Sequence, residues 1–74
     1  MNSGLTMVKT VINTLGADDM VKITSARTGN IFYWGSAAGV HKYLEYELCN
    51  VREGVAYDVD GKAYLVTFIN LLQY

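Results

Sequence analysis

The segment that most restricts the fold of this chain is "VAYDVDGKAYLVTFI", residues 55–69, in which two strand-like runs flank Asp60 and Gly61. An aspartate-glycine pair between two such runs is one of the stronger short-range signals for a β-hairpin. The segment therefore predicts a strand near 51–59, a turn at the aspartate-glycine pair, and a second strand over 62–69.

The register of this hairpin is open, and the register decides on which face each side chain lies. A two-residue turn places Tyr57 opposite Tyr64. A three-residue loop with a bulge instead puts Tyr57 on one face with Ala63 and Leu65. A slip of one residue moves every side chain to the other face. In either register the second strand carries apolar groups on both faces, so we expect its outer face to be covered or to be a contact surface.

The N-terminal segment has the spacing of an amphipathic helix. Its apolar residues recur at intervals of three, four and three: Leu5, Val8, Ile12 and Leu15. Such spacing places them on one helical face. The pattern predicts a helix over residues 3–15, which Gly16 is placed to end in the left-handed conformation.

The middle of the chain is rich in strand formers. "MVKITSA" and "IFYWG" flank Gly29, which suits a turn position with positive φ, so residues 20–35 are predicted to form a first hairpin. Helical spacing then predicts a short helix near 37–46, weakened by Gly39. Residues 1–74 are thus expected to form a single α+β domain of order αββαββ. In it, the N-terminal helix packs on a four-stranded, mainly antiparallel sheet made of two hairpins.

Charge and composition argue against several classes of function. Six basic residues, scattered along the chain, stand against seven acidic ones for a formal net charge of −1, which disfavours nucleic acid as a partner. The single cysteine excludes an intramolecular disulfide and fits a reducing compartment. No apolar run is long enough to span a bilayer, and the N-terminus lacks the pattern of a secretory signal. The sequence therefore predicts a cytoplasmic protein with no membrane partner.

Candidates for catalysis and for metal binding are few. His41 and Cys49 are the only available base and nucleophile, and nothing in the sequence supplies the activating third group that such a pair needs. The "DVDG" segment is similar to the start of a calcium-binding loop, but the twelfth position, which needs a glutamate, is Ile69. Asp58 and Asp60 are therefore predicted to serve the turn. We expect no enzymatic activity, no cofactor and no metal.

Residues 29–47 hold five of the nine aromatic residues: Phe32, Tyr33, Trp34, Tyr43 and Tyr46. A small domain needs two or three such rings in its core. Tyrosine and tryptophan are also enriched at protein interfaces. The predicted partner-binding residues are Tyr33, Trp34, Tyr43 and Tyr46. A protein is the expected partner, because stacking of nucleic-acid bases would also need a basic track beside the rings.

The order of a short helix, "DDMVKIT", "IFYWG", a linking segment and the closing "VAYDVDGKAYLVTFI" resembles many small bacteriophage and prophage proteins. Some proteins of this size and origin inhibit bacterial defence, anti-CRISPR proteins among them. The resemblance implies a non-catalytic protein-binding module in the cytoplasm of a bacterial host cell, such as a stoichiometric inhibitor of a defence nuclease. The alternative is a homo-oligomeric structural or assembly protein of a virion. Both functions fit the expectation that the protein self-associates or has a constitutive protein partner.

Overall fold

The computed structural model describes residues 6–72, and 51% of these residues lie in strands, so the described part of the protein is mainly β. The elements in chain order are β1 (Thr6–Met7), α1 (Val8–Ile12), β2 (Met20–Ser25), β3 (Ile31–Ser36), the 3-10 helix η1 (Ala37–Gly39), β4 (Glu47–Tyr57) and β5 (Ala63–Leu71). The five strands form one sheet in the order β1-β4-β5-β2-β3.

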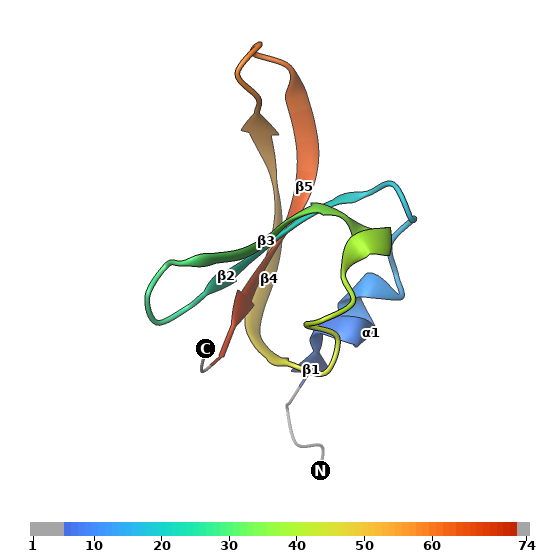
Figure 1. The fold of residues 1–74 in the computed structure, drawn as a ribbon, viewed down its shortest axis with the longest axis vertical. Coiled ribbons are helices and arrows are strands. Elements are labelled where there is room, and N and C mark those ends of the chain that lie inside the picture. The colour runs from blue at the N-terminus through green and yellow to red at the C-terminus, as the bar shows by residue number, and fades with distance from the viewer. Residues whose placement is uncertain (1–5, 73–74) are drawn as a thin grey trace.

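Two hairpins, β2–β3 and β4–β5, make up most of the sheet, and they join along a parallel seam. In this seam Met20 of β2 lies beside Val66 of β5, and Ser25 lies beside Leu71. All other neighbouring strands are antiparallel. The sheet is curved into half of a barrel, and the β4–β5 hairpin rises beyond the rest of the molecule (Figure 1). The described chain is accordingly elongated, with extents of 45 × 27 × 21 Å.

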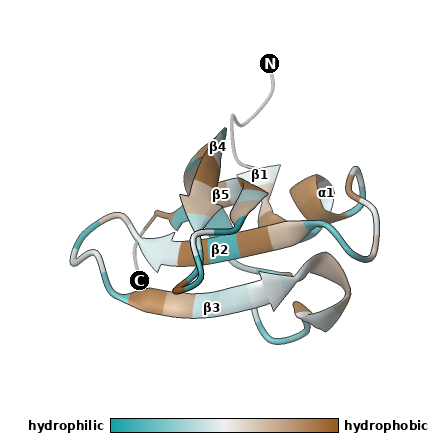
Figure 2. Cartoon of the chain, turned by 90° about the horizontal axis from the view of Figure 1, so that it is seen from above, coloured by the Kyte–Doolittle hydropathy of each residue, from teal (hydrophilic) through white to brown (hydrophobic). Residues whose placement is uncertain are grey.

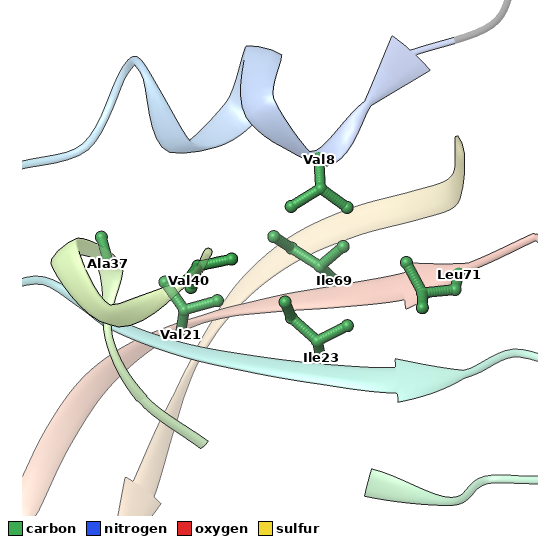
Figure 3. Close-up of a cluster of buried hydrophobic side chains, with 7 residues drawn as sticks. All are labelled: Val8, Val21, Ile23, Ala37, Val40, Ile69 and Leu71. Atoms are coloured by element: carbon green, nitrogen blue, oxygen red, sulfur yellow. The ribbon is translucent and has the colours of Figure 1, made fainter. Parts of the chain in front are cut away.

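One face of the sheet, the core face, carries the hydrophobic core. Its buried side chains are Val8, Val21, Ile23, Ala37, Val40, Ile69 and Leu71. Figure 3 shows Val8 of α1 directed toward Ile69 of β5. Along β2 the buried Val21 and Ile23 alternate with Lys22, as the alternating colours of Figure 2 show. Lys22 and the residues in register with it therefore lie on the opposite side, which we call the outer face.

The predicted αββαββ arrangement on a four-stranded, mainly antiparallel sheet is wrong. The sheet has five strands and a parallel seam, and the N-terminal helix is only five residues long. The backbone N–H of Val8 donates to the carbonyl of Tyr46 at 2.9 Å. The N–H of Lys9 donates in the same way to Leu44, also at 2.9 Å. Because these bonds tie the segment to the turn before β4, and β1 pairs with β4 itself, little of the segment is left to form a helix.

The apolar spacing of the N-terminal segment still serves packing. Three of its four spaced residues reach the core: Val8, Ile12 and Leu15. The fourth, Leu5, lies outside the described residues. The predicted helix end at Gly16 is wrong, because α1 already gives way to turns at Asn13.

The predicted helix near 37–46 is also wrong. Only the three residues of η1 are helical, and the chain leaves them with Val40 in extended backbone at φ −82° and ψ 91°. The Tyr33 hydroxyl donates to the carbonyl of Ser36 at 2.6 Å. It also lies so close to Gly39 that a Cβ there would collide with it. The phenol of Tyr33 therefore holds this segment in a tight turn against β3, and a longer helix does not form.

Both predicted hairpins are present. Their turn glycines, Gly29 and Gly61, have φ values of 80° and 82°, a region that glycine enters without strain. In the second hairpin Tyr57 pairs with Ala63, so it shares a face with Ala63 and Leu65. The backbone N–H of Asp58 donates to the carbonyl of Lys62, and that of Gly61 donates to Asp58, both at 3.0 Å, so the loop consists of residues 59–61 and ends at Gly61. The second alternative, the three-residue loop, is the one that forms.

Candidate functional site

The structure separates Trp34 from the three tyrosines that were predicted to bind a partner with it. Tyr33, Tyr43 and Tyr46 are half-buried and pack against the core, whereas Trp34 is exposed on the outer face. The Tyr43 hydroxyl donates to the carbonyl of Phe32 at 3.2 Å, just as Tyr33 donates to the backbone near η1. The contacts of Tyr33, Tyr43 and Tyr46 thus lie within the chain, and a partner role for them stays a prediction.

The crowding of aromatic residues has a packing explanation. The Phe32 and Tyr43 rings stack at 6.0 Å between centroids, and Tyr43 meets Tyr46 edge-on at 5.4 Å. Offset and edge-to-face pairs of this kind add to the stabilisation from burial. These three rings form a cluster that closes one side of the small core.

Trp34 stands at one end of a row of alternating rings and cations that crosses four strands. In register across β3, β2, β5 and β4, the row consists of Trp34, Lys22, Phe68 and Arg52. The Arg52 guanidinium carbon lies 4.8 Å from the centroid of the Phe68 ring, and the Lys22 ammonium lies 6.0 Å from it. We call these four residues the basic–aromatic row. The cations that are scattered in the sequence are partly gathered here by the fold.

The neighbours of the row along the strands support it on both sides. On one side the Thr24 hydroxyl donates to the amide oxygen of Asn70 at 2.5 Å, and Asn70 donates to Asn50 at 2.8 Å. On the other side is Gly54, where a Cβ would lie 2.9 Å from the Phe68 ring. The glycine lets the ring of Phe68 lie over β4, next to Arg52.

A hollow of about 310 Å³ opens beside the row. It is lined by Lys22, Ile31, Trp34, Ala56 and Tyr57. Trp34 keeps 47% of its surface exposed, and Ile31 is exposed as well. The Lys22 ammonium is the only charged group among the lining residues, so the hollow is an apolar site with two rings and one cation.

A second exposed surface lies on the core face, where the β4–β5 hairpin projects beyond α1 and the core. Val55 and Leu65 pair across the two strands, and 54% and 69% of their surface is exposed. Together with their neighbours on this face they form what we call the ribbon patch: Val51, Val55, Tyr57, Ala63 and Leu65. Along β4, the only charged residue on this face between Val51 and Tyr57 is Glu53.

The loop at the tip of the same hairpin is organised by Asp58. One carboxylate oxygen accepts the backbone N–H groups of Asp60 and Lys62, both at 2.9 Å, and the other accepts the Tyr64 hydroxyl at 3.1 Å. The N–H of Lys62 and the other donors lower the pKa of Asp58 below its usual 3.8. The hydrogen bond between the Tyr64 hydroxyl and Asp58, together with the negative charge of Asp58, raises the pKa of Tyr64. The expectation that Asp58 serves the turn is confirmed.

The remaining candidates from the sequence stand apart from these surfaces. His41 and Cys49 are both exposed, and Cys49 is a free thiol. Within residues 6–72, no group of three or more histidine, cysteine, aspartate or glutamate side chains is arranged to hold a metal ion. The same part of the chain has no helix with the length and apolar character needed to cross a membrane. Comparison of the chain with protein-family models, with curated proteins and with solved structures finds no match.

Proposed function

We propose that this protein is a non-catalytic protein-binding module that associates with a second copy of itself through the ribbon patch. The observation that carries this proposal is the exposure of apolar side chains on a two-stranded ribbon. β5 pairs with β2 only from Val66 onward, so the paired segments 55–57 and 63–65 have no third strand within residues 6–72. A two-stranded ribbon standing in water is marginally stable by itself.

Contact between two ribbon patches would shield the most exposed apolar side chains of the two strands of this hairpin from water. Burial of apolar surface contributes roughly 25 cal/mol per Å². The patch carries large apolar groups on both strands, Val55 and Tyr57 on β4 and Leu65 on β5. Such a contact would therefore stabilise the part of the hairpin that the rest of the chain leaves unsupported.

The outer edge of β4 favours a second copy as the occupant. β1 covers this edge only at Leu48 and Glu47, so residues 50–57 have no strand on that side within the described chain. An antiparallel pairing of β4 with the same strand of a second copy would set the two ribbon patches side by side on one face of a continuous sheet. Such a pairing is compatible with two-fold symmetry, the commonest symmetry of homo-oligomers. Glu53 is the single charge on the β4 part of the patch face, so like charges oppose such a contact only weakly.

Sedimentation of the parent and of a Val55→Asp variant over micromolar to submillimolar concentrations tests this proposal. We expect the parent to exceed its monomer mass of 8.2 kDa as concentration rises, and the variant to remain monomeric and folded. Val59→Asp is the matched control, because it adds the same charge to the same hairpin at a fully exposed loop position. A parent that stays monomeric throughout would overturn the proposal, as would equal loss of association in both variants.

The resemblance to small phage proteins suggests a different occupant for the same patch, a host defence nuclease. No described residue carries chemistry specific to such a target, so this partner stays a prediction. Affinity capture from a bacterial lysate, with the Val55→Asp variant as the control bait, separates the two. A nuclease retained by a monomeric parent and lost with the variant would assign the ribbon patch to that partner and remove the second copy from it.

A further inference from the structure

We propose that the basic–aromatic row and the hollow beside it form a binding site for a nucleotide, either free or as part of a single strand. The base would stack on Trp34 and its phosphate would be held by Lys22, while Arg52, at the far end of the row, would hold a further phosphate of a strand. The row lies on the outer face of the sheet, and the hollow beside it shares only Tyr57 with the ribbon patch. The proposal does not depend on the proposed self-association.

The shape and lining of the hollow favour a flat, largely apolar group. Its volume of about 310 Å³ lies at the small end of the range of ligand pockets. The indole of Trp34 forms part of one wall and makes no ring or cation–π contact within the described residues, which leaves its exposed face free for stacking. Ile31 and Ala56 add apolar contact, and Tyr57 supplies a second ring. An aromatic base fits this combination.

The charges of the row favour an anion at the edge of that base. Lys22 lines the hollow, and Arg52 lies two strands away on the same face. Within residues 6–72 neither forms an ion pair, in contrast to Lys9, which pairs with Glu45 at 3.1 Å. Their contacts with the Phe68 ring leave N–H donors available, since arginine has five and lysine three.

Glu53 and Asp58, the first two acidic residues after Arg52 in sequence, do not neutralise the row. Glu53 follows Arg52 along β4, and the alternation of the strand puts it on the other face. Asp58 is occupied by the backbone of the hairpin loop and by Tyr64. A local cationic surface therefore exists on a chain whose net charge is −1, and the low net charge does not by itself exclude a phosphate ligand.

The row also has the length to contact more than one nucleotide. It crosses four adjacent strands, which at roughly 4.8 Å between neighbours is about 14 Å from Trp34 to Arg52. Sheet surfaces that bind single strands use exposed rings as stacking platforms with cations beside them. A free nucleotide would use Trp34 and Lys22 alone, whereas a strand would also engage Arg52 at the far end of the row.

Trp34 provides a direct measurement, because it is the only tryptophan of the chain. We expect its fluorescence to be quenched saturably by adenosine monophosphate, by a twelve-nucleotide oligothymidylate, or by both. Quenching by the mononucleotide as strongly as by the oligonucleotide would assign the site to free nucleotides. Quenching by the oligonucleotide alone, with an affinity that falls as salt rises, would assign it to a single strand.

Charge variants then test the named residues at low salt, with a labelled oligonucleotide followed by anisotropy. Lys22→Gln and Arg52→Gln should each weaken binding about tenfold and lower the salt slope by about one. Trp34→Ala should weaken binding without changing that slope. Lys42→Gln is the matched control, since it removes the same charge from the turn that precedes β4 and should have no effect. Melting curves establish that each variant is folded.

Three results would overturn the proposal. The first is the absence of quenching and of an anisotropy change with either nucleotide ligand at low salt. The second is a loss of binding in Lys42→Gln equal to that in Lys22→Gln and Arg52→Gln, which would show that binding depends on the net charge of the protein and not on the row. The third is equally tight binding of polyglutamate, an anion without rings, which would assign the surface to acidic protein segments and exclude base stacking.

Discussion

In the β2–β3 hairpin Val21 and Ile23 are fully buried, whereas in the projecting part of the β4–β5 hairpin Val55 and Leu65 are among the most exposed apolar residues. Both hairpins have strands in which apolar residues recur at every second position. They differ in what surrounds them. β2 lies between β5 and β3 and under the core, while the end of the β4–β5 hairpin has no third strand and no covering element within residues 6–72.

The free edges of the two hairpins differ in the same way. β3 is an edge strand, but the Tyr43 hydroxyl donates to the carbonyl of Phe32 and the turn that starts at η1 packs against it. The outer edge of β4 beyond Leu48 has no such cover in the described chain. An uncovered edge invites pairing with another chain. The comparison indicates that the first hairpin is committed to the core of this chain and that the second is available for contact outside it.

Matched valine truncations in the two hairpins test this difference most directly, because they should have unequal effects on the free energy of unfolding. Val21→Ala should lower the free energy of unfolding by about 2 kcal/mol, because it removes two buried methyl groups and leaves a cavity. Val55→Ala should lower it by about 0.5 kcal/mol or less in the monomer. Urea denaturation at low protein concentration measures both. Similar losses would mean that the projecting ribbon is as much a part of the core as β2.

A smaller effect is expected from Gly39→Ala, which tests how rigidly Tyr33 holds the turn after the first hairpin. The added methyl group would collide with the Tyr33 hydroxyl, so we expect a loss of about 1 kcal/mol or more. Adding Tyr33→Phe removes the colliding oxygen and should recover part of that loss. Thermal melting of both single variants and of the double variant measures the coupling. Strict additivity would show that Tyr33 does not determine the turn.

The tip of the second hairpin should respond only locally to Asp58→Ala. The change removes the acceptor for the N–H groups of Asp60 and Lys62, so their amide hydrogens should exchange faster, while those of the buried β2 are unchanged. Asp60→Ala removes the same charge from the same loop and serves as the control. Faster exchange throughout β2 would show that the tip and the core unfold together.

The smallest effect is the pH dependence of the same loop. Since the folded-state pKa of Asp58 lies below 3.8, its contribution to stability is complete above that pH and is lost as the pH falls through the lowered value. NMR of the Lys62 amide should therefore show a transition below pH 3.8 that is absent in Asp58→Asn. A transition above that pH would contradict the hydrogen-bonding scheme of the loop.

The elements that the sequence predicts correctly depend on neighbours along the chain. Gly29, Gly61 and the strand-like runs beside them determine two hairpins through local geometry. The parallel seam between β2 and β5 has no local signal, because it joins distant segments that each read as an ordinary strand. The predicted helices are longer than the observed ones for a related reason. Helical spacing shows which side chains share a face, but hydrogen bonds from Val8 to Tyr46 and packing of Tyr33 on Gly39 decide the backbone.

For the candidate sites, too, local sequence signals identify single residues but not their arrangement across strands. Trp34 was predicted to be available to a partner, and it is exposed beside the hollow. Alternation along β2 and β4 would have identified Lys22 and Arg52 as outward-facing residues. Their place in one row with Trp34 depends on the order of the strands in the sheet, which no single segment encodes. The ring count indicates that some of the rings belong to the core, but it does not indicate which ones: Tyr43 and Tyr46, predicted to bind a partner, pack against the core.

The parallel seam between β2 and β5 bears on how fast the chain reaches its native state. Thr24 and Asn70, which face each other across the seam, are 46 residues apart in sequence, whereas each hairpin closes over a short loop. Closing a long loop has an entropic cost that short loops avoid, and contacts between distant residues slow folding. We therefore expect the two hairpins to form early and the seam to form last. Truncation of Ile69 would then accelerate unfolding far more than it slows refolding, and stopped-flow kinetics that show the reverse would place the seam in the folding nucleus.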